Sequence, residues 1–175
     1  MKKVLVVSSS LRKGSHSAAL AAEFARGAQE AGNEVVTYSL VNKKLHFCIG
    51  CRKCQQTFRC IYKDDADEIV EAMREADVVV FATPVYYYGV SGQLKVLFDR
   101  TFAIFRTNYK FTDIYLLASA ADEAPETMDL PISNVQAWVD CHPKASLKGV
   151  VSALGMSSSR ELNDHPARQE AYQMG

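Results

Sequence analysis

Four cysteines fall within 13 residues of the chain, with the spacing Cys48-x2-Cys51-x2-Cys54-x5-Cys60. Gaps of two residues allow successive thiolates to converge on one point, which both a cuboidal iron–sulfur cluster and a tetrahedral Zn²⁺ require. Gly50 lies in the first gap and eases a tight turn. In a reducing compartment, four cysteines so close together indicate a metal or redox site rather than a disulfide framework.

Three interpretations of this cluster stay open from the residues alone. A 4Fe–4S cluster would transfer single electrons, whereas Zn²⁺ or thiols that form reversible disulfides would be structural or redox-sensing. The third interpretation is a motif without metal, particularly in protein produced aerobically, because exposed thiols oxidise and clusters are lost. The fifth cysteine, Cys141, stands alone and is expected to be a small apolar residue at a helix end.

A second candidate site is the serine-rich segment 8–17, which lies between an apolar run and the start of a helical pattern. Small residues let backbone N–H groups turn towards an anion, and a helix N-terminus adds favourable partial charge. The hydroxyl groups of Ser10, Ser15 and Ser17 add donors, and Arg12 can neutralise a phosphate. The segment therefore predicts a phosphate-binding loop, with a solvated turn and helix cap as the alternative.

This segment differs from the other common phosphate-binding loops. It lacks both the Gly-x-x-x-x-Gly-Lys motif of nucleotide triphosphatases and the Gly-x-Gly-x-x-Gly motif of dinucleotide-binding proteins. It contains no cysteine, which argues against a phosphatase with a thiolate nucleophile in this loop. The expected strands end in Ser8 and Thr83 rather than in carboxylates, which argues against a phosphoacceptor signalling domain.

The segment 83–95 is the most distinctive part of the sequence because it contains three consecutive tyrosines, Tyr86, Tyr87 and Tyr88. Three adjacent side chains point in different directions, so they cannot all lie in the core. Pro84 and Gly89 bracket the expected turn. Such a loop offers a flat apolar wall and backbone hydrogen bonds to a planar heterocycle, and it could also contact a neighbouring subunit.

The elements that must position these segments alternate between short apolar runs and longer helical periods. This alternation is typical of a parallel sheet wrapped by helices, so we predict a three-layer α/β/α sandwich. Ligands in such folds bind at the carboxyl ends of the strands, near the switch point of a strand order that we expect to be 2-1-3-4-5. The five expected strands span residues 4–7, 34–40, 77–83, 112–119 and 147–154. Five helices are expected over 17–31, from 65 onwards, over 91–105 and 131–141, and from 164 onwards.

Several details of these helices are specific enough to test. Asp65 is expected to cap the second helix, with Glu68 completing a capping box. Asp164, with a proline two residues later in the first turn, is expected to open the last helix. Phe102 is placed on the buried side of the helix over 91–105. The sequence further predicts that Trp138 packs on the sheet and that the other histidines outside the phosphate loop, at 46, 142 and 165, are surface or capping residues.

Length and charge narrow the class of protein. The chain has 175 residues, which suggests one domain over residues 1–175 with a cysteine-rich loop at 41–63. Lys and Arg number 20, as do Asp and Glu, so charge gives no reason to expect nucleic acid or an anionic membrane as a partner. No apolar run approaches the ~20 residues of a membrane helix, and the run 4–7 is shorter than that of a signal peptide. We therefore expect a cytoplasmic protein.

Two segments together carry a resemblance to a known family. The chain from Ser10-Leu11-Arg12 to Ser17, together with Pro84-Val85-Tyr86, Ser91-Gly92-Gln93-Leu94-Lys95 and Asp99-Arg100, resembles the NAD(P)H-dependent FMN reductase family of flavodoxin-like proteins. The resemblance extends to about Leu154, and its specific part is the second segment. Leu11 stands where proline is usual and Ser15 where glycine is usual. The cysteine pattern is similar to that of the iron–sulfur flavoproteins, a branch of the family with this spacing at this position.

The resemblance implies FMN as cofactor and NAD(P)H as electron donor. It implies that the FMN phosphate contacts Ser10, Arg12, Ser15, His16 and Ser17. It implies that the flavin ring lies against Pro84, Val85, Tyr86, Tyr87, Tyr88 and Gly89. The other side of the ring would be closed by Ala118, Ser119, Ala120, Ala121 and Asp122. As ligands of a 4Fe–4S cluster it implies Cys48, Cys51, Cys54 and Cys60.

Three functional hypotheses follow. The first is an FMN-dependent oxidoreductase that takes hydride from NADH or NADPH, in which the flavin does the chemistry and no side chain need act as a general acid. The second is an electron carrier that relays single electrons between a 4Fe–4S cluster, FMN and protein partners. The third is a non-catalytic redox sensor with the thiols as its switch. The expected acceptor is a small molecule or a protein, and we expect a homodimer or homotetramer.

Overall fold

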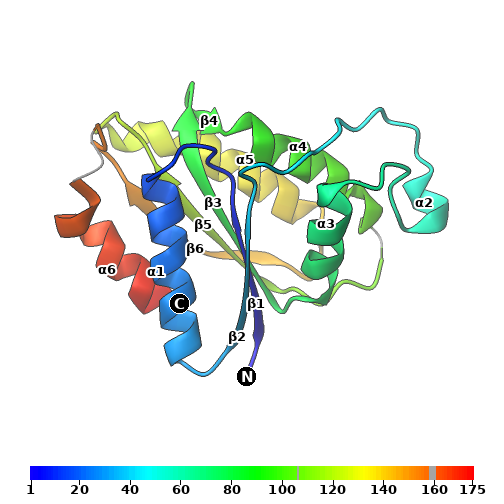
Figure 1. Ribbon diagram of the computed structural model, residues 1–175, viewed down its shortest axis with the longest axis horizontal. Helices are drawn as coiled ribbons and strands as arrows, with labels where there is room; N and C mark the ends of the chain where they lie inside the picture. Colours follow the sequence, from blue (N-terminus) through cyan, green and yellow to red (C-terminus); the bar gives the residue numbers. More distant parts are fainter. Residues whose placement is uncertain (106, 158–160) are drawn as a thin grey trace.

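A parallel β-sheet forms the middle of the molecule in the computed structural model, which describes residues 1–105, 107–157 and 161–175 (Figure 1). Its long strands lie in the order β2-β1-β3-β5-β6, and β4 pairs with β3 in antiparallel fashion. The strands are β1 (Lys3–Ser8), β2 (Glu34–Ser39), β3 (Val78–Tyr86), β4 (Gly89–Val90), β5 (Asp113–Ser119) and β6 (Ser146–Ala153). The predicted fold and strand order are confirmed, and the two-residue β4 is a sixth strand that the apolar pattern did not predict.

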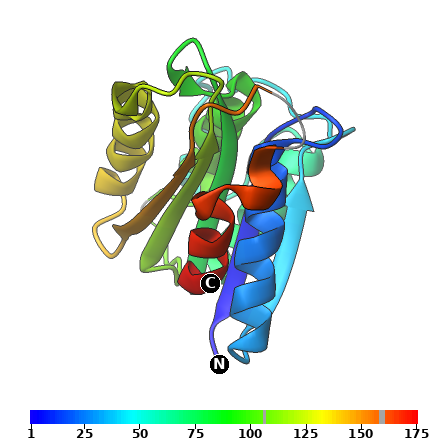
Figure 2. The same ribbon diagram turned by 90° about the vertical axis from the view of Figure 1, so that its left-hand side faces the viewer.

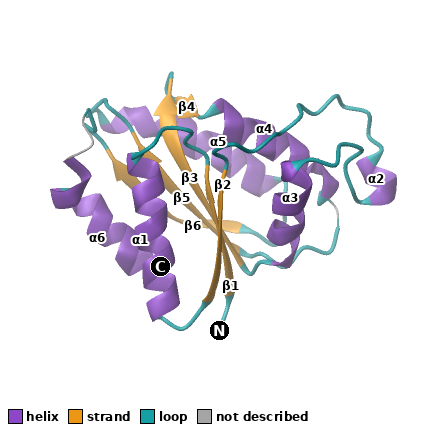
Figure 3. Ribbon diagram, viewed as in Figure 1, coloured by secondary structure: helices purple, strands orange, loops and turns teal. Residues whose placement is uncertain are grey.

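Helices cover both faces of this sheet (Figure 3). The helices α1 and α6 pack on one face, and α3, α4 and α5 on the other; Figure 2 shows α5 opposite α1 and α6. They are α1 (His16–Glu30), α2 (Cys54–Thr57), α3 (Asp65–Glu75), α4 (Gly92–Arg100), α5 (Asp129–Asp140) and α6 (Pro166–Met174). None of the helices in the described ranges is long and apolar enough to cross a membrane.

The strand β1 shows how the sequence dictates this arrangement. Val4 and Val6 point into the core under α1 and α6, whereas Leu5 and Val7 point into the core under α3, α4 and α5. All four side chains are buried, as expected for a parallel strand covered on both faces. β1 pairs with both β2 and β3, so it is an inner strand and its carboxyl end lies between the ends of these two neighbours. The serine-rich segment that follows β1 is therefore held at the strand-order switch point.

The start of α3 differs from the prediction by one residue. Asp64 rather than Asp65 is the N-cap, and its Oδ1 accepts a hydrogen bond from the Ala66 N–H at 3.1 Å. The predicted capping box is wrong because Glu68 then lies one position too far along the helix. Glu68 instead accepts a hydrogen bond from the Tyr38 hydroxyl at 2.9 Å. The last helix differs in the opposite direction, since its cap lies one residue later than predicted.

That cap is His165, whose Nδ1 accepts a hydrogen bond from the Ala167 N–H at 3.1 Å, while Asp164 belongs to the preceding 3₁₀ turn. The helix α4 is shorter than the predicted 91–105, because the chain continues as a 3₁₀ turn over Thr101–Ala103. A 3₁₀ turn advances each side chain by a larger angle than an α-helix, so the apolar face changes direction there. Phe102 is consequently 36% exposed and does not lie on the buried side as predicted.

The end of α5 tests three further expectations, of which that for His142 is wrong. Trp138 packs edge-on against Phe81 of β3, with ring centroids 5.2 Å apart, which confirms its predicted place on the sheet. His142 is buried rather than at the surface, because the turn after α5 folds it against Trp138, and its Nδ1–H donates to the Trp138 carbonyl at 2.8 Å. Its Nε2 is buried without a hydrogen-bond partner in the part of the chain that the structure describes. Cys141 is the C-cap of α5, at a helix end as predicted, and it is exposed.

We expect His142 to make the protein less stable as the pH falls below about 6.5. Burial lowers the pKa of His142 below its ordinary 6.5 and outweighs the hydrogen bond to Trp138. The unfolded chain therefore binds a proton first, and the free energy of unfolding decreases as the pH falls from 6.5 towards the folded-state pKa. Urea unfolding of wild type and His142→Gln, at about pH 7.5 and about pH 5.5, measures this dependence. Equal losses of stability in the two proteins would contradict it.

Candidate functional site

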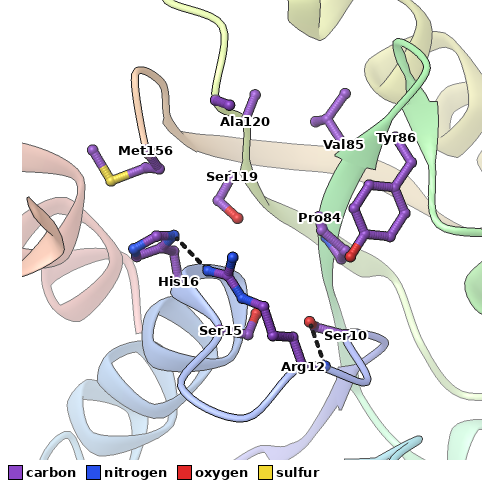
Figure 4. A pocket seen from close by; sticks show the side chains of 11 residues that line it. Ser10, Arg12, Ser15, His16, Pro84, Val85, Tyr86, Ser119, Ala120 and Met156 are labelled. Atoms are coloured by element: carbon purple, nitrogen blue, oxygen red, sulfur yellow. Dashed lines mark hydrogen bonds between the residues drawn. The ribbon is translucent and has the colours of Figure 1, made fainter. Parts of the chain in front are cut away.

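A cavity of about 210 Å³ opens at the carboxyl ends of β1, β3 and β5, where the strand order predicts a ligand site (Figure 4). Its walls come from the loop after β1 with the start of α1, the end of β3, the loop after β5 and the loop after β6. The lining residues are Ser10, Arg12, Ser15, His16, Pro84, Val85, Tyr86, Ser119, Ala120, Ala121 and Met156.

The loop after β1 and the start of α1 form the polar end of this cavity. Ser15 is the N-cap of α1 and accepts a hydrogen bond from the Ala18 N–H at 3.4 Å, and its Oγ lies 3.0 Å from the Ser17 Oγ. Gly14 turns the chain into the cap with a φ of +69°, a value that favours glycine. The Arg12 Nη2 lies 3.5 Å from the His16 Nδ1, on the same side of the cavity (Figure 4). An anion there meets one guanidinium, hydroxyl groups and the positive end of a helix.

A chain of buried hydroxyl groups joins this loop to the loop after β3. The Ser91 Oγ donates to the Ser9 Oγ at 2.8 Å, and the Ser9 Oγ donates to the Ala82 carbonyl at 3.0 Å. The Ser91 N–H in turn donates to the Thr83 Oγ1 at 3.0 Å. All three hydroxyl-bearing residues are buried, so water does not compete for these hydrogen bonds. The bonds therefore fix the spacing between the loop after β1 and the loop after β3. Sequence reasoning missed this network, because it joins residues that are 82 positions apart.

The tyrosines form the tip of a β-hairpin between β3 and β4. Val85 pairs with Val90 and Tyr86 with Gly89, which leaves Tyr87 and Tyr88 as the two-residue turn. Both turn residues have positive φ, 47° and 60°, as a type I′ turn requires. The Tyr87 side chain is fully exposed and points away from the cavity that Tyr86 lines. The hairpin therefore presents one tyrosine to the cavity and one to solvent.

The Tyr88 hydroxyl links this hairpin to the loop after β5. It donates to the Asp122 Oδ2 at 3.2 Å. Asp122 also accepts a hydrogen bond from the Ala124 N–H at 3.1 Å, and this bond, followed by that from Tyr88, lowers the pKa of the Asp122 carboxyl. The two loops on either side of the cavity are thus tied together by an ionised carboxylate.

Replacing Tyr87 with asparagine is expected to stabilise the protein by about 0.5–1 kcal/mol, because a left-handed conformation costs tyrosine more than asparagine. The exposed Tyr87 side chain makes no packing contact that the replacement would remove. Urea midpoints of Tyr87→Asn and of Tyr86→Asn measure the effect, since Tyr86 is not among the residues with positive φ. A Tyr87→Asn protein less stable than wild type would show that the turn is not strained.

The structure brings together most, but not all, of the predicted site residues. Those that line the cavity are Ser10, Arg12, Ser15, His16, Pro84, Val85, Tyr86, Ser119, Ala120 and Ala121. Those outside its lining are Ser17, Tyr87, Tyr88, Gly89, Ala118 and Asp122. Ser17 and Ala118 are buried behind the lining residues. Met156 joins the lining from the loop after β6, and nothing in its residue type could have indicated this.

The four clustered cysteines lie in the cysteine loop, residues 41–63, which connects β2 to α3 and carries the single turn of α2 beyond α3 (Figure 1). All four line one cavity of about 40 Å³, together with Ile49, Ile61, Tyr62 and other residues of the loop and with Phe102. Gly50 turns the loop with a φ of +66°, as predicted. Within the described ranges, no three His, Cys, Asp or Glu side chains converge closely enough to hold a single metal ion.

The chemistry of these thiols favours the binding of a positively charged group. The pKa of the Cys54 thiol is raised, first by burial and then by the charges of Cys60, Cys48 and Cys51. Thiolates held in one small cavity would repel one another, and a bound metal would remove this repulsion. The sulfurs share a cavity without meeting at one point, as a single Zn²⁺ with bonds of about 2.3 Å would require.

Comparison with known proteins agrees with this geometry. Residues 2–125 match the model of the family described as NADPH-dependent FMN reductase, and these residues include both loops that line the polar and apolar ends of the cavity. They also include the whole cysteine loop.

Two curated relatives are iron–sulfur flavoproteins. The chain is 41% identical over 99 residues to one from Methanocaldococcus jannaschii, which covers 57% of this chain and 51% of that protein. It is 30% identical over 141 residues to one from Methanosarcina thermophila, covering 80% of this chain and 74% of that protein. The chain spans about half the length of most of the iron–sulfur flavoproteins it matches, with 42–51% covered in four of them.

Among solved structures, an azoreductase from Bacillus anthracis str. Sterne superposes with a TM-score of 0.74 at 20% identity, covering 99% of this chain and 98% of that chain. At that identity the likeness shows the flavodoxin-like fold alone. The family match and the relative from Methanosarcina thermophila confirm the resemblance that the two loops and the cysteine spacing predict. The chain belongs to the NADPH-dependent FMN reductase family, in its iron–sulfur flavoprotein branch.

Proposed function

We propose that this protein is an FMN-dependent NAD(P)H oxidoreductase of the flavin or quinone reductase type. The observation that carries the proposal is the cavity at the switch point, which has an anion-binding end and an apolar wall within one space. When bound there, FMN would supply the hydride-transfer chemistry. The protein's own residues bind it, orient it and exclude water, and no side chain of the cavity needs to act as a general acid.

The polar end of the cavity suits the FMN phosphate. Arg12 and His16 supply donors from the side, Ser10 and Ser15 supply hydroxyl groups, and α1 points its N-terminus at the same space. Charge-assisted hydrogen bonds to a phosphate are roughly twice as strong as neutral ones. The phosphate would therefore provide much of the affinity for the cofactor.

The apolar end suits a flat ring system. Pro84 and Val85 line this end from β3, and Ser119 and Ala120 line it from the end of the neighbouring β5 and the loop after it (Figure 4). Backbone N–H groups of the segment 86–89 would stabilise negative charge that develops on the ring, whereas the Ala120 N–H already donates to the Ala153 carbonyl at 2.9 Å. The chain lacks a Gly-x-Gly-x-x-Gly motif, so we propose that the nicotinamide stacks on the exposed face of the flavin. The acceptor would be a quinone, free flavin, a nitroaromatic or an iron–sulfur protein.

We further propose that the cysteine loop holds a 4Fe–4S cluster on Cys48, Cys51, Cys54 and Cys60. The shared cavity and the mutual repulsion of the thiolates support this proposal. Cluster chemistry is one-electron transfer, which the reductase reaction on FMN does not need. The cluster would therefore extend the range of acceptors to single-electron partners.

The surroundings of the cysteine loop support a proposed homodimer or homotetramer. Phe47, Ile49 and Phe58 are 75%, 62% and 52% exposed, so the loop presents large apolar side chains to solvent. Clustered exposed apolar side chains mark interaction surfaces in many proteins. We also propose that residues 1–175 form one flavodoxin-like FMN-binding domain and that the protein is cytoplasmic, where thiol clusters are kept reduced.

Steady-state oxidation of NADPH and NADH, with a quinone and with free FMN as acceptors, tests the enzyme function. Brisk turnover supports the reductase. Slow turnover together with rapid reduction by a ferredoxin would support the electron carrier instead, which the family match does not favour. Absence of both reactions in FMN-loaded protein would contradict both functions and leave the redox sensor.

A further inference from the structure

The cysteine loop is anchored to a buried arginine at the end of α4. The Arg100 Nη1 donates to the Asp64 Oδ2 at 2.7 Å and the Nη2 to the Asp64 Oδ1 at 2.9 Å, so the two side chains form a bidentate pair. Their side chains are only 1% and 5% exposed. A buried pair of this kind is costly to break, because either partner alone is an uncompensated charge.

The same guanidinium also binds the backbone on both sides of the cysteine motif. The Nη1 donates to the His46 carbonyl and the Nη2 to the Tyr62 carbonyl, both at 3.0 Å. His46 precedes Cys48 by two residues, and Tyr62 follows Cys60 by two residues. The rings of His46 and Tyr62 are stacked with centroids 4.6 Å apart. Arg100 therefore closes the segment that carries the four cysteines into a ring.

One donor of Arg100 remains after these contacts. An arginine has five N–H groups, and four of them are used by Asp64 and the two carbonyls. The fifth, on Nε, is buried and has no hydrogen-bond partner within the described residues. Burial alone would lower the pKa of Arg100, but its bond to Asp64 and then the charge of Cys60 raise it. Cys60 and Asp64 are thus the two side chains whose interaction with the guanidinium raises its pKa.

We propose that Arg100 is the positioning residue of the cysteine cavity: it closes the loop and offers its Nε–H to the Cys60 thiolate. A hydrogen bond to a cluster-ligating sulfur stabilises the reduced, more negative form, so it raises the reduction potential. The inference rests on the proposed cluster for its electrochemical part, whereas closure of the loop by Arg100 is independent of metal.

The position of Arg100 also connects the two sites through one rigid element. Ser91 caps the start of α4, beside the flavin cavity, and accepts the Leu94 N–H at 3.4 Å. Arg100 is the last residue of the same helix, at the cysteine loop. Nine helical residues span about 13 Å, so α4 fixes the cysteine cavity at a set distance from the loop after β3.

The test compares Arg100→Lys and Asp64→Asn with the control Arg74→Lys. Lysine keeps the charge but offers one nitrogen in place of a fork, so it cannot bind Asp64, both carbonyls and Cys60 together. Asparagine keeps the cap of α3 but removes the charge pair. Arg74 also donates to a carbonyl of the loop, that of Phe58 at 2.9 Å, but Cys60 is not among its hydrogen-bond partners.

Amide hydrogen exchange of the protein as purified anaerobically is the first readout. Exchange within residues 45–63 is expected to accelerate at least about tenfold in Arg100→Lys and in Asp64→Asn, with β1 and α1 unchanged as evidence of folding. The second readout is the reduction potential of the cluster. The potential is expected to become more negative in Arg100→Lys. The change should be smaller in Asp64→Asn, because this variant retains the Nε–H of Arg100, and the potential should stay constant in Arg74→Lys.

The outcomes separate this inference from the proposed function. Wild-type exchange rates in both Arg100→Lys and Asp64→Asn would overturn the closure of the loop by Arg100, whatever the iron content. Faster exchange with equal potentials in the two variants would overturn the bond to Cys60. If Arg100→Lys does not fold, the exchange rates of Asp64→Asn decide whether Arg100 closes the loop. Arg100→Gln, which keeps a side-chain N–H, then replaces Arg100→Lys in the measurement of the reduction potential. Wild-type protein without iron would contradict the cluster and leave the exchange result standing.

Discussion

Replacing Arg12 with alanine is expected to weaken FMN binding by about 10-fold to 100-fold. Arg12 lines the polar end of the cavity, and within that lining it is the arginine that can pair with a dianionic phosphate. Hydrogen bonds to charged groups contribute about 1.5–3 kcal/mol, and each 1.4 kcal/mol is about a tenfold change in affinity. The helix N-terminus and the serine hydroxyl groups remain in the variant, so binding should be weakened but not abolished.

Fluorescence titration of apoprotein with FMN, at two salt concentrations, measures this effect. The salt dependence should be smaller in Arg12→Ala, because a charge pair with the phosphate has been removed. Arg168→Ala is the matched control, since Arg168 is a partly exposed arginine of α6 that pairs with Glu23 away from the cavity. Equal FMN affinity in wild type and Arg12→Ala would refute the assignment of the loop after β1 to the phosphate. Equal losses in Arg12→Ala and Arg168→Ala would indicate an unspecific effect of charge.

Replacing Cys54 with serine is expected to remove nearly all iron from anaerobically purified protein. Cys54 is one of four thiols that line the cavity of the cysteine loop, and a cuboidal cluster uses four thiolates. A serine hydroxyl is a far poorer ligand, because it remains protonated at neutral pH and lacks the soft sulfur that iron–sulfur clusters prefer. Wild type is expected to hold about four iron and about four sulfide per chain.

Iron, acid-labile sulfide and zinc assays on wild type, Cys54→Ser and Cys141→Ser decide this prediction. Cys141 is the matched control because it is exposed and lies outside the lining of the cysteine cavity. Its replacement should leave the iron content unchanged. About one zinc per chain in wild type would identify the site as zinc instead, and iron retained by Cys54→Ser would contradict the proposed ligand set.

The sequence predicts the sheet well, because its strands carry their own signal. The run Val4–Val7 is apolar at every position, as a central parallel strand covered on both faces should be, and all four side chains are buried. The helix ends are less predictable, since Asp64 and Asp65 are equally good caps by residue type. The choice between them depends on the loop contacts of Asp64 with Arg100 and His46, which are formed only in the folded chain.

The candidate site likewise contains parts that the sequence predicts and parts that it does not. Serines after a buried strand and a Pro-Val-Tyr segment before a helix have local signatures, and both segments line the cavity. The orientation of Tyr87 has no local signature, because type I′ turns usually carry Asn-Gly and this one carries two tyrosines. The roles of Met156 and Arg100 depend on contacts between distant parts of the chain, which no single-sequence pattern encodes.

The most direct test of the central claim is an anaerobic absorbance spectrum of FMN-loaded protein before and after addition of NADPH or NADH. The account predicts that FMN copurifies or binds to the cavity in about one equivalent and that its visible bands are bleached when the nicotinamide is added. A broad additional absorbance with matching iron would reveal the cluster in the same sample. A protein that binds no FMN, or whose bound flavin is not reduced by either nicotinamide, would contradict the account.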